Sequence, residues 1–428
     1  MKEDFLHYLW NHKKFNHGAL QTTAGAVIEL VNTGMHNQLA GPDFFNARLR
    51  INGQLWAGNV ELHVKASQWY AHGHEEDHAY DNVILHVVWE EDIAVYGTQN
   101  MPLPTLELRE YVPVMLLDSY EKLFYRVGNA FINCEQDFDA APDALIQDWL
   151  ERLYLERLER KVKEIENLLR ESQNDWEAVL FKMLARNFGT KINGAAFAGL
   201  ARAIPFKTVR KAGQIEEGLE TLLLGHAQLL PEETTEEQVA RWKKEYSFLR
   251  NKFQLSENQS EPVQFFRLRP PNFPTLRLSQ LANLYNGNDT LFARLMQASD
   301  VETFYELLTV KASAYWDTHY NFGKTHKKRS KTLPKAFINL LLINTVIPLK
   351  FAYLRSKTTE NPEDILELLA AIPSEKNQIV DGFYKMRNLP QNALTSQALL
   401  QLKINYCDPN ACLKCRIGNF LISSPGVL

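Results

Sequence analysis

The sequence has few cysteines, little net charge and no long uninterrupted apolar run, and each shortage excludes a class of protein. Four cysteines in 428 residues exclude a small secreted scaffold held together by disulfide bonds. A net charge of −4 means that binding to nucleic acid would need a local basic surface, because the chain as a whole is not basic. The most apolar stretch, 337–354, is broken by polar residues and by Pro348, which favours a buried helix over a membrane span.

The first residues are acidic and lack the apolar segment of a secretory signal. We therefore expect a cytoplasmic protein without a membrane partner, and the sequence names no protein partner. Hydrophobic residues make up 45% and charged residues 23%, which is the balance of an ordinary globular protein. A chain of this length is expected to divide into two or three domains.

The first hundred residues carry the alternation of a sheet that follows one helix. Apolar residues at helical spacing predict a short helix over 5–10, and Asn52-Gly53 predicts a tight hairpin turn. Residues 67–82 are polar and rich in histidine, which predicts a short helix or a loop. The predicted strands cover residues 26–31, 44–51, 54–65, 83–89 and 103–108.

Helical periodicity dominates from residue 143 to residue 402. The predicted fold class is therefore α+β, with an N-terminal α/β domain of a helix and a mixed sheet followed by a mostly α-helical domain. The predicted parts are an α/β domain at 1–112, a linker carrying Cys134 at 113–142, the helical domain at 143–402, and a cysteine knuckle with the C-terminal tail at 403–428.

Three polar residues alternate in the predicted strand 54–65. Glu61, His63 and Lys65 share one face because successive side chains of a strand point to opposite sides. A carboxylate, an imidazole and an amine in a row favour metal-assisted chemistry. An ordinary half-exposed strand has the same pattern. The residues that surround this face in the fold must show whether it is a metal site.

The order of helix, three strands, connector and strand, with a literal Pro-Asp at Asp43 before Glu61, resembles the PD-(D/E)XK nuclease superfamily. The resemblance implies a nuclease-like domain that hydrolyses phosphodiester bonds in DNA or RNA. It also implies that Asp43 and Glu61 hold Mg²⁺ or Mn²⁺, which lowers the pKa of a bound water. Glu29 on the preceding strand is a candidate third ligand.

The sequence departs from that superfamily at one position. The resemblance expects a catalytic lysine where His63 stands, and Lys65 lies two residues further along the same face. Both remain candidate catalytic residues beside Asp43 and Glu61. The departure leaves open a non-catalytic scaffold that keeps the nuclease fold and binds nucleic acid or protein.

Histidines are concentrated at the N-terminal end, where nine of the twelve lie within the first 86 residues. A group in the connector offers a second metal or phosphate site, because imidazole and carboxylate suit transition metals. It consists of His72, His74, Asp77 and His78. This leaves open a histidine-dependent metallohydrolase, although solvated loop histidines have the same pattern. We expect His86 to be a core histidine.

Three of the four cysteines form a C-x4-C-x2-C knuckle near the C-terminus. Thiolates at such spacing converge on one ion, and a metal is favoured over disulfide bonds in a chain without a secretion signal. The predicted ligands are Cys134, Cys407, Cys412 and Cys415. Four thiolates suit either Zn²⁺ or a 4Fe-4S cluster, so the ligand type leaves both open. Reduced structural thiols are the alternative.

Two segments of the helical domain join basic and aromatic residues, a composition suited to phosphate contact and base stacking. The candidate nucleic-acid contacts are Arg267, Arg269, Arg277, Lys324, Lys327, Lys328 and Arg329. A charged run is also typical of a solvated loop.

Long motifs spread over nearly the whole chain resemble one uncharacterised bacterial family that is carried as a domain of unknown function. They include GPDFFNARL, GNVELHV, ERLYLERLERK, RLRPPNFPTLRLSQLA, YWDTHYNFG and INTVIPLKFAY. This resemblance implies no established activity, so the functional prediction depends on the nuclease-like site and the cysteines.

Overall fold

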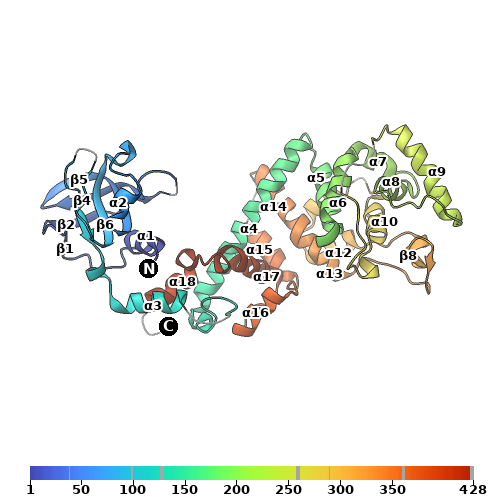
Figure 1. The fold of residues 1–428 in the computed structure, drawn as a ribbon. Helices are drawn as coiled ribbons and strands as arrows, with labels where there is room; N and C mark the ends of the chain where they lie inside the picture. The colour runs from blue at the N-terminus through green and yellow to red at the C-terminus, as the bar shows by residue number, and fades with distance from the viewer. Residues whose placement is uncertain are drawn as a thin grey trace. The chain divides into compact units, whose positions relative to one another are not determined.

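The computed structural model describes residues 1–37, 39–97, 100–125, 130–256, 261–288, 290–358 and 362–424. The chain forms two compact units, one comprising 1–149 with 402–428 and the other comprising 150–401 (Figure 1). Each unit is described by itself. The C-terminal segment therefore belongs to the same unit as the N-terminal sheet.

A mixed sheet forms the centre of the first unit (Figure 1). Its strand order is β1-β2-β4-β5-β6-β7, with β3 paired to β4. Neighbouring strands from β1 to β5 are antiparallel, whereas β5, β6 and β7 are parallel. The strands span Leu20–Gln21 (β1), Val27–Asn32 (β2), Met35–His36 (β3), Phe44–Ile51 (β4), Gln54–Lys65 (β5), Val83–Glu90 (β6) and Thr105–Glu107 (β7).

The hairpin between β4 and β5 forms at the predicted turn. Asn52 and Gly53 both have positive φ, 49° and 79°, which is the backbone conformation that a two-residue hairpin turn of the favoured hand requires. The bounds of β4 and β5 agree with the predicted strands. A correct turn fixes the register, and the register decides which side chains of β5 share a face.

The two faces of the sheet have different partners. Leu62 pairs with Val87 and lies on the face covered by α1 (Glu3–Asn11), which packs against β5. Glu61 pairs with His86 on the opposite face. The short helix α2 (Gln68–Ala71) follows β5, and its fully buried Trp69 belongs to the core on that side.

The rest of the first unit is mostly helical. It contains the one-turn η1 (His78–Tyr80), α3 (Val114–Phe124), the start of α4 (Asp143–Glu171), and α18 (Arg416–Ser423). Helix α18 packs against α3, so the end of the chain returns to the N-terminal unit (Figure 1).

The second unit is α-helical apart from one small hairpin, and the predicted α+β fold class is confirmed. Its helices, after the remainder of α4, are α5 (Trp176–Phe188), α6 (Thr190–Ala203), α7 (Phe206–Gly213), α8 (Gly218–His226), α9 (Glu237–Lys252), α10 (Pro274–Tyr285), α11 (Leu291–Gln297), α12 (Val301–Leu308), α13 (Lys335–Leu341), α14 (Ile347–Ser356), α15 (Pro362–Ala371), α16 (Gln378–Met386) and α17 (Ala393–Leu402). The hairpin strands are β8 (His319–Asn321) and β9 (Lys324–Thr325).

One helical stretch in the described ranges, Lys335–Ser356, is long and apolar enough to cross a membrane by length and composition. Of its apolar window, 72% is buried inside the structure, and Ile338, Leu341 and Leu349 are fully buried. A helix that is buried in this way packs as part of the unit's core. The stretch consists of α13, a wider π-helical turn at Leu342–Val346, and α14.

Candidate active site

Asp43 and Glu61 meet where β4 begins and β5 continues beyond its pairing with β4. The pairing of β5 with β4 stops at Val60, which leaves the backbone of Leu62 without a β4 partner. The Asp43 carboxylate fills this place by accepting the N–H of Leu62 at 2.9 Å. In return, the backbone N–H of Asp43 donates to Glu61 Oε2 at 3.0 Å. The structure therefore brings the two carboxylate residues together and fixes both through the backbone.

Three imidazoles converge beside the other oxygen of Glu61. One ring nitrogen from each of His63, His72 and His74 lies within 4.8 Å of the other two. Glu61 Oε1 is 3.3 Å from His74 Nε2 and 3.6 Å from His63 Nε2. We call Glu61, His63, His72 and His74 the histidine–glutamate cluster. The three nitrogens form a donor set that suits a transition metal, and the Glu61 oxygen lies beside two of them.

Burial dominates the electrostatics of the cluster. Glu61 and His63 are 5% and 1% exposed. Burial, with the charge of Asp43 second, raises the pKa of Glu61 to about 9, and burial together with the neighbouring imidazoles lowers the pKa of His63 to about 2. Without a bound cation the site thus favours neutral side chains. A metal ion would supply the positive charge that makes a buried carboxylate favourable.

A second layer of side chains orients the imidazoles. His86 Nε2 lies 2.9 Å from His63 Nδ1, so a hydrogen bond between them fixes the ring of His63 and its tautomer. Trp69 contacts the rings of both His74 and His86, and Tyr80 stacks on His74 with ring centroids 3.8 Å apart. His86 is fully buried, as expected of a core histidine, and it also supports the cluster.

His72 is the exposed member of the cluster. Its Nδ1 lies 3.2 Å from His63 Nε2, so it closes the cluster on the side that faces solvent. A metal that also binds a substrate needs a coordination position left open toward solvent, and His72 marks the solvent side of the cluster.

His7 is a residue of this region that sequence reasoning missed. Its Nε2 lies 3.1 Å from Asp43 Oδ2. Burial lowers the pKa of His7, but the hydrogen bond to Asp43 and its charge outweigh that effect and raise the pKa above its ordinary value. His7 also lines a cavity of about 420 Å³ together with His36, Lys2 and Lys414. Position 7 lies between apolar helix positions, and nothing in the local pattern connects it to Asp43.

Four predicted site residues lie apart from the cluster. Glu29 is exposed and pairs with Arg50, near the opposite end of β4 from Asp43, so the structure does not bring it to the carboxylate pair. Lys65 is exposed at the end of β5, beyond His63. The side chain of His78 is 92% exposed and bonds to Asp81. Asp77 caps η1 by accepting the N–H of Ala79. Of the predicted group, His72 and His74 thus belong to the cluster, whereas Asp77 and His78 do not.

The four cysteines all belong to the first unit. Burial raises the pKa of Cys134 and of Cys407, and in both cases the charges of the other cysteines add to the effect, which shows that the thiols lie near one another. Asn133 Nδ2 joins the two segments by donating to Cys412 Sγ at 3.6 Å and to Asn410 Oδ1 at 3.1 Å.

The cysteine knuckle is compact. Gly418 packs against it so closely that a side chain there would overlap the carbonyl of Cys412. Four thiolates from two distant segments suit either a tetrahedral zinc ion or a 4Fe-4S cluster, so ligand type leaves both open.

The predicted nucleic-acid contacts fall into exposed and buried groups. Arg277 is only 3% exposed, donates to Gln280 and Asn272, and lies 3.7 Å from the ring centroid of Phe337. This removes Arg277 from the candidate surface. Its place in α10, which packs inside the unit, could not be seen from the alternation of arginines and apolar residues. The remaining contacts are exposed: Arg267, Arg269, Lys324, Lys327, Lys328 and Arg329.

A family model described as "Protein of unknown function (DUF2851)" matches residues 3–378. The chain belongs to this family. The match covers the sheet, the histidine–glutamate cluster and most of the helical unit, and it ends before the cysteine knuckle at 407–415. Neither curated proteins nor solved structures gave a match, and no comparison matched the PD-(D/E)XK superfamily. An activity must therefore be argued from the side chains.

Proposed function

We propose that the first unit is a metal-dependent hydrolase of phosphodiester bonds in nucleic acid, with a transition metal held by His63, His72, His74 and Glu61. The observation that carries the proposal is the convergence of three imidazole nitrogens within 4.8 Å beside the buried Glu61 oxygen. Buried carboxylates and imidazoles are seldom gathered without a charge to bind, because each pays for the loss of water.

The donor set favours zinc, iron or manganese over magnesium. Mg²⁺ prefers oxygen ligands and keeps several waters, whereas imidazole nitrogen suits transition metals. Asp43 Oδ2 already accepts the N–H of Leu62 and lies next to His7. Asp43 thus positions Glu61 without binding the metal. The nuclease resemblance assigns Asp43 as a ligand of Mg²⁺ or Mn²⁺, and here the imidazoles would be the ligands instead.

A metal at this place would polarise a phosphate and make hydroxide available near neutral pH. The protein's own residues supply the rest. Glu61 is held by the backbone of Asp43, His86 fixes the ring of His63, and the exposed His72 marks the side from which a substrate approaches. His7, held by Asp43, is placed to donate a proton toward the cavity that it lines.

The class of substrate is supported by two features. One is the pairing of Asp43, just before β4, with Glu61 on the neighbouring strand β5, the two carboxylates that the nuclease resemblance names. The cavity beside His7 carries the cationic side chains Lys2 and Lys414. Cations beside a metal site suit a phosphate ester.

The test is a cleavage assay on single- and double-stranded DNA and RNA with Mn²⁺, Zn²⁺ or Mg²⁺ added to metal-free protein. We expect cleavage with Mn²⁺ or Zn²⁺, and a loss of at least about 100-fold in His74→Ala, because outer-shell changes alone cost 10 to 100-fold. His78→Ala is the matched control, since His78 lies in the same connector but outside the cluster.

Binding of nucleic acid without turnover under every metal would contradict the proposal and favour the scaffold alternative. Turnover of small phosphate esters alone would instead support a histidine-dependent metallohydrolase and reject nucleic acid as the substrate.

We also propose that Cys134, Cys407, Cys412 and Cys415 hold a 4Fe-4S cluster. The thiols gather from two segments far apart in the sequence, and four thiolates suit such a cluster. Iron and sulfide in the purified protein, with visible absorption that disappears in Cys134→Ser, are the expected results. A colourless protein with one tightly held zinc at the cysteines would reject the cluster.

A further inference from the structure

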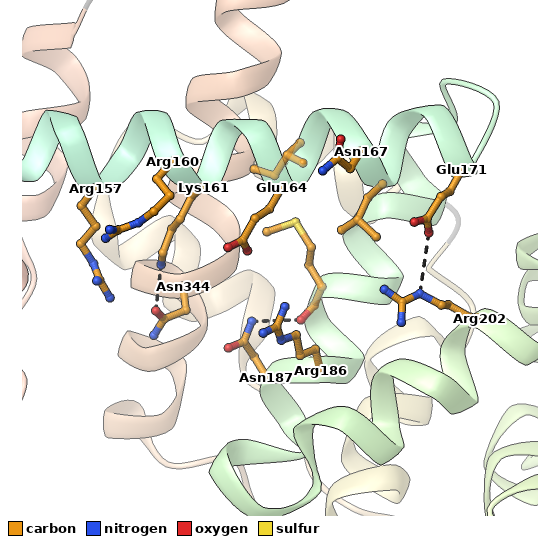
Figure 2. Close-up of a pocket in the computed structure, with 13 residues that line it drawn as sticks. Arg157, Arg160, Lys161, Glu164, Asn167, Glu171, Arg186, Asn187, Arg202 and Asn344 are labelled. Atoms are coloured by element: carbon orange, nitrogen blue, oxygen red, sulfur yellow. Dashed lines mark hydrogen bonds and ion pairs between the residues drawn. The ribbon is translucent and has the colours of Figure 1, made fainter. Parts of the chain in front are cut away.

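A cavity of about 500 Å³ in the second unit has more cations than carboxylates in its lining (Figure 2). Its charged side chains are Arg157, Arg160, Lys161, Arg186 and Arg202, set against Glu164 and Glu171. Figure 2 shows the side chains of α4 facing Asn344 and Asn187 on neighbouring helices. We call this the basic cavity. Its volume falls within the usual range for small-ligand sites.

The cations of α4 are held in place by neutral groups. Arg157 Nε donates to Gln397 at 3.0 Å, and an Arg160 terminal nitrogen donates to Gln401 at 2.5 Å. Amide partners fix a guanidinium group without neutralising it, and they leave its other N–H groups available. Within the described ranges, neither arginine has a carboxylate within ion-pair distance.

Lys161 is anchored by a local distortion of the helix across the cavity. Pro348 has no N–H to offer the carbonyl of Asn344, and the N–H of Ile347 bonds instead to Leu342, which widens the helix into a π turn. The carbonyl of Ile343 is thereby released and accepts the Lys161 ammonium at 3.3 Å.

The side chain of Asn344 completes the support of Lys161. Its Oδ1 accepts from the Lys161 ammonium at 2.9 Å. An ammonium has three donors, so one remains for a ligand after these two bonds. Two polar groups from one distorted turn therefore hold Lys161 at the edge of the cavity.

The arrangement is unfavourable without an anion. Arg157, Arg160 and Lys161 stand three and four residues apart on one face of α4, where like charges repel. Arg186 adds a fourth cation from α5 and has no ion-pair partner in the part of the chain that the structure describes. Arg202 pairs with Glu171 at 3.7 Å, and the charges of Glu164 and Glu375 act on Arg157 and Lys161. The five cations still exceed these three carboxylates, and a multiply charged anion would balance the excess.

We propose that the basic cavity binds the phosphate groups of a small polyphosphate ligand of about nucleotide size. The guanidinium groups of Arg157, Arg160 and Arg186 would contact phosphate oxygens through their free N–H groups, and Lys161 would add a point charge. The cavity lies wholly within the second unit, so this site is independent of the hydrolase proposed for the first unit.

The experiment is calorimetric titration of the full-length protein with inorganic pyrophosphate at constant ionic strength set by chloride, because salt screens exposed charges. We expect saturable binding that weakens at least about tenfold in Arg186→Gln, which removes a charge without a folding partner. Lys163→Gln is the matched control, since Lys163 is exposed on α4 and does not line the cavity. It should change the affinity less than about twofold.

No saturable binding of pyrophosphate, or equal weakening by Arg186→Gln and Lys163→Gln, would overturn the proposal. A single-stranded oligonucleotide that binds through Arg186 while pyrophosphate does not bind would also overturn it, because the cavity would then contact a nucleic-acid backbone. Melting temperatures measured beside the titrations confirm that both variants are folded.

Discussion

The histidine–glutamate cluster of the first unit and the basic cavity of the second carry opposite chemistry. The cluster gathers a carboxylate and imidazoles that offer lone pairs, and all of its side chains except that of His72 are buried. The cavity gathers cations that offer N–H groups, and several of its side chains are exposed. One site therefore suits a cation and the other an anion.

The two sites also differ in how their side chains are held. Backbone N–H groups at a strand edge fix Asp43 and Glu61, whereas side-chain amides and a π turn fix the cations of α4. A strand edge allows little adjustment because the sheet sets its register. Side-chain amides adapt more easily, so the cavity can follow the shape of its ligand.

The largest effect on stability is expected at a cation of the second unit that has no ligand-binding role. Arg277→Ala removes two hydrogen bonds and the packing on Phe337, and it should lower the free energy of unfolding by about 2–4 kcal/mol. Arg267→Ala, at an exposed position, should stay within about 0.5 kcal/mol of wild type. Urea unfolding of both variants measures the contrast, and equal losses would show that Arg277 is not a structural residue.

A smaller loss of stability is expected when the hydrogen bond between Asp43 and β5 is removed. Asp43→Ala leaves the N–H of Leu62 without its acceptor and should cost about 1–3 kcal/mol of unfolding free energy. Asp43→Asn keeps an oxygen acceptor and should recover most of that loss. If both variants unfold like wild type, the carboxylate does not fix the edge of β5.

A pH dependence of stability is expected in the basic cavity. Burial, with the charge of Arg157 second, lowers the pKa of Lys161 to about 7, while Glu164 and Glu375 oppose the shift and Arg160 adds to it. Below pH 7 both folded and unfolded chains bind this proton, so the burial penalty is fully present. Between about pH 7 and the ordinary lysine pKa near 10.4, only the unfolded chain keeps the proton, and stability from this group rises with pH.

Lys161→Met should remove that slope, since Met fills similar space without a proton to titrate. Melting temperatures of wild type and variant from pH 6 to pH 9, without added phosphate, measure the difference. Parallel curves would mean that the Lys161 ammonium is not desolvated.

Local patterns predicted β2, β4, β5 and β6 and, with wider bounds, β7, because alternation and the Asn52-Gly53 turn determine register within a hairpin. The two-residue strands β1 and β3 were not predicted, and the meeting of Asp43 with Glu61 was implied only by the nuclease resemblance. The same patterns could not separate His72 and His74, which join the cluster, from His78, which lies in the same connector. Which of these histidines packs toward the cluster depends on Trp69 and the fold of α2. The spacing of the histidines predicts neither.

Contacts between segments far apart in the chain could not be predicted from the sequence. His7 reaches Asp43 from a helix, Arg277 is buried by Phe337, and the basic cavity forms only when α4, α5, α6 and the turn at Asn344 pack together. Each contact joins segments that no local periodicity connects. Arg277 was predicted as a nucleic-acid contact because its burial could not be seen in the sequence.

The most direct test of the metal site is calorimetric titration of metal-free protein with Mn²⁺, which prefers oxygen and nitrogen ligands and so separates the cluster from the cysteines. The account predicts one site per chain, weakened by more than about 100-fold in His74→Ala and nearly unchanged in His78→Ala. Absence of Mn²⁺ binding by wild type, or the same affinity in His74→Ala, would contradict the site.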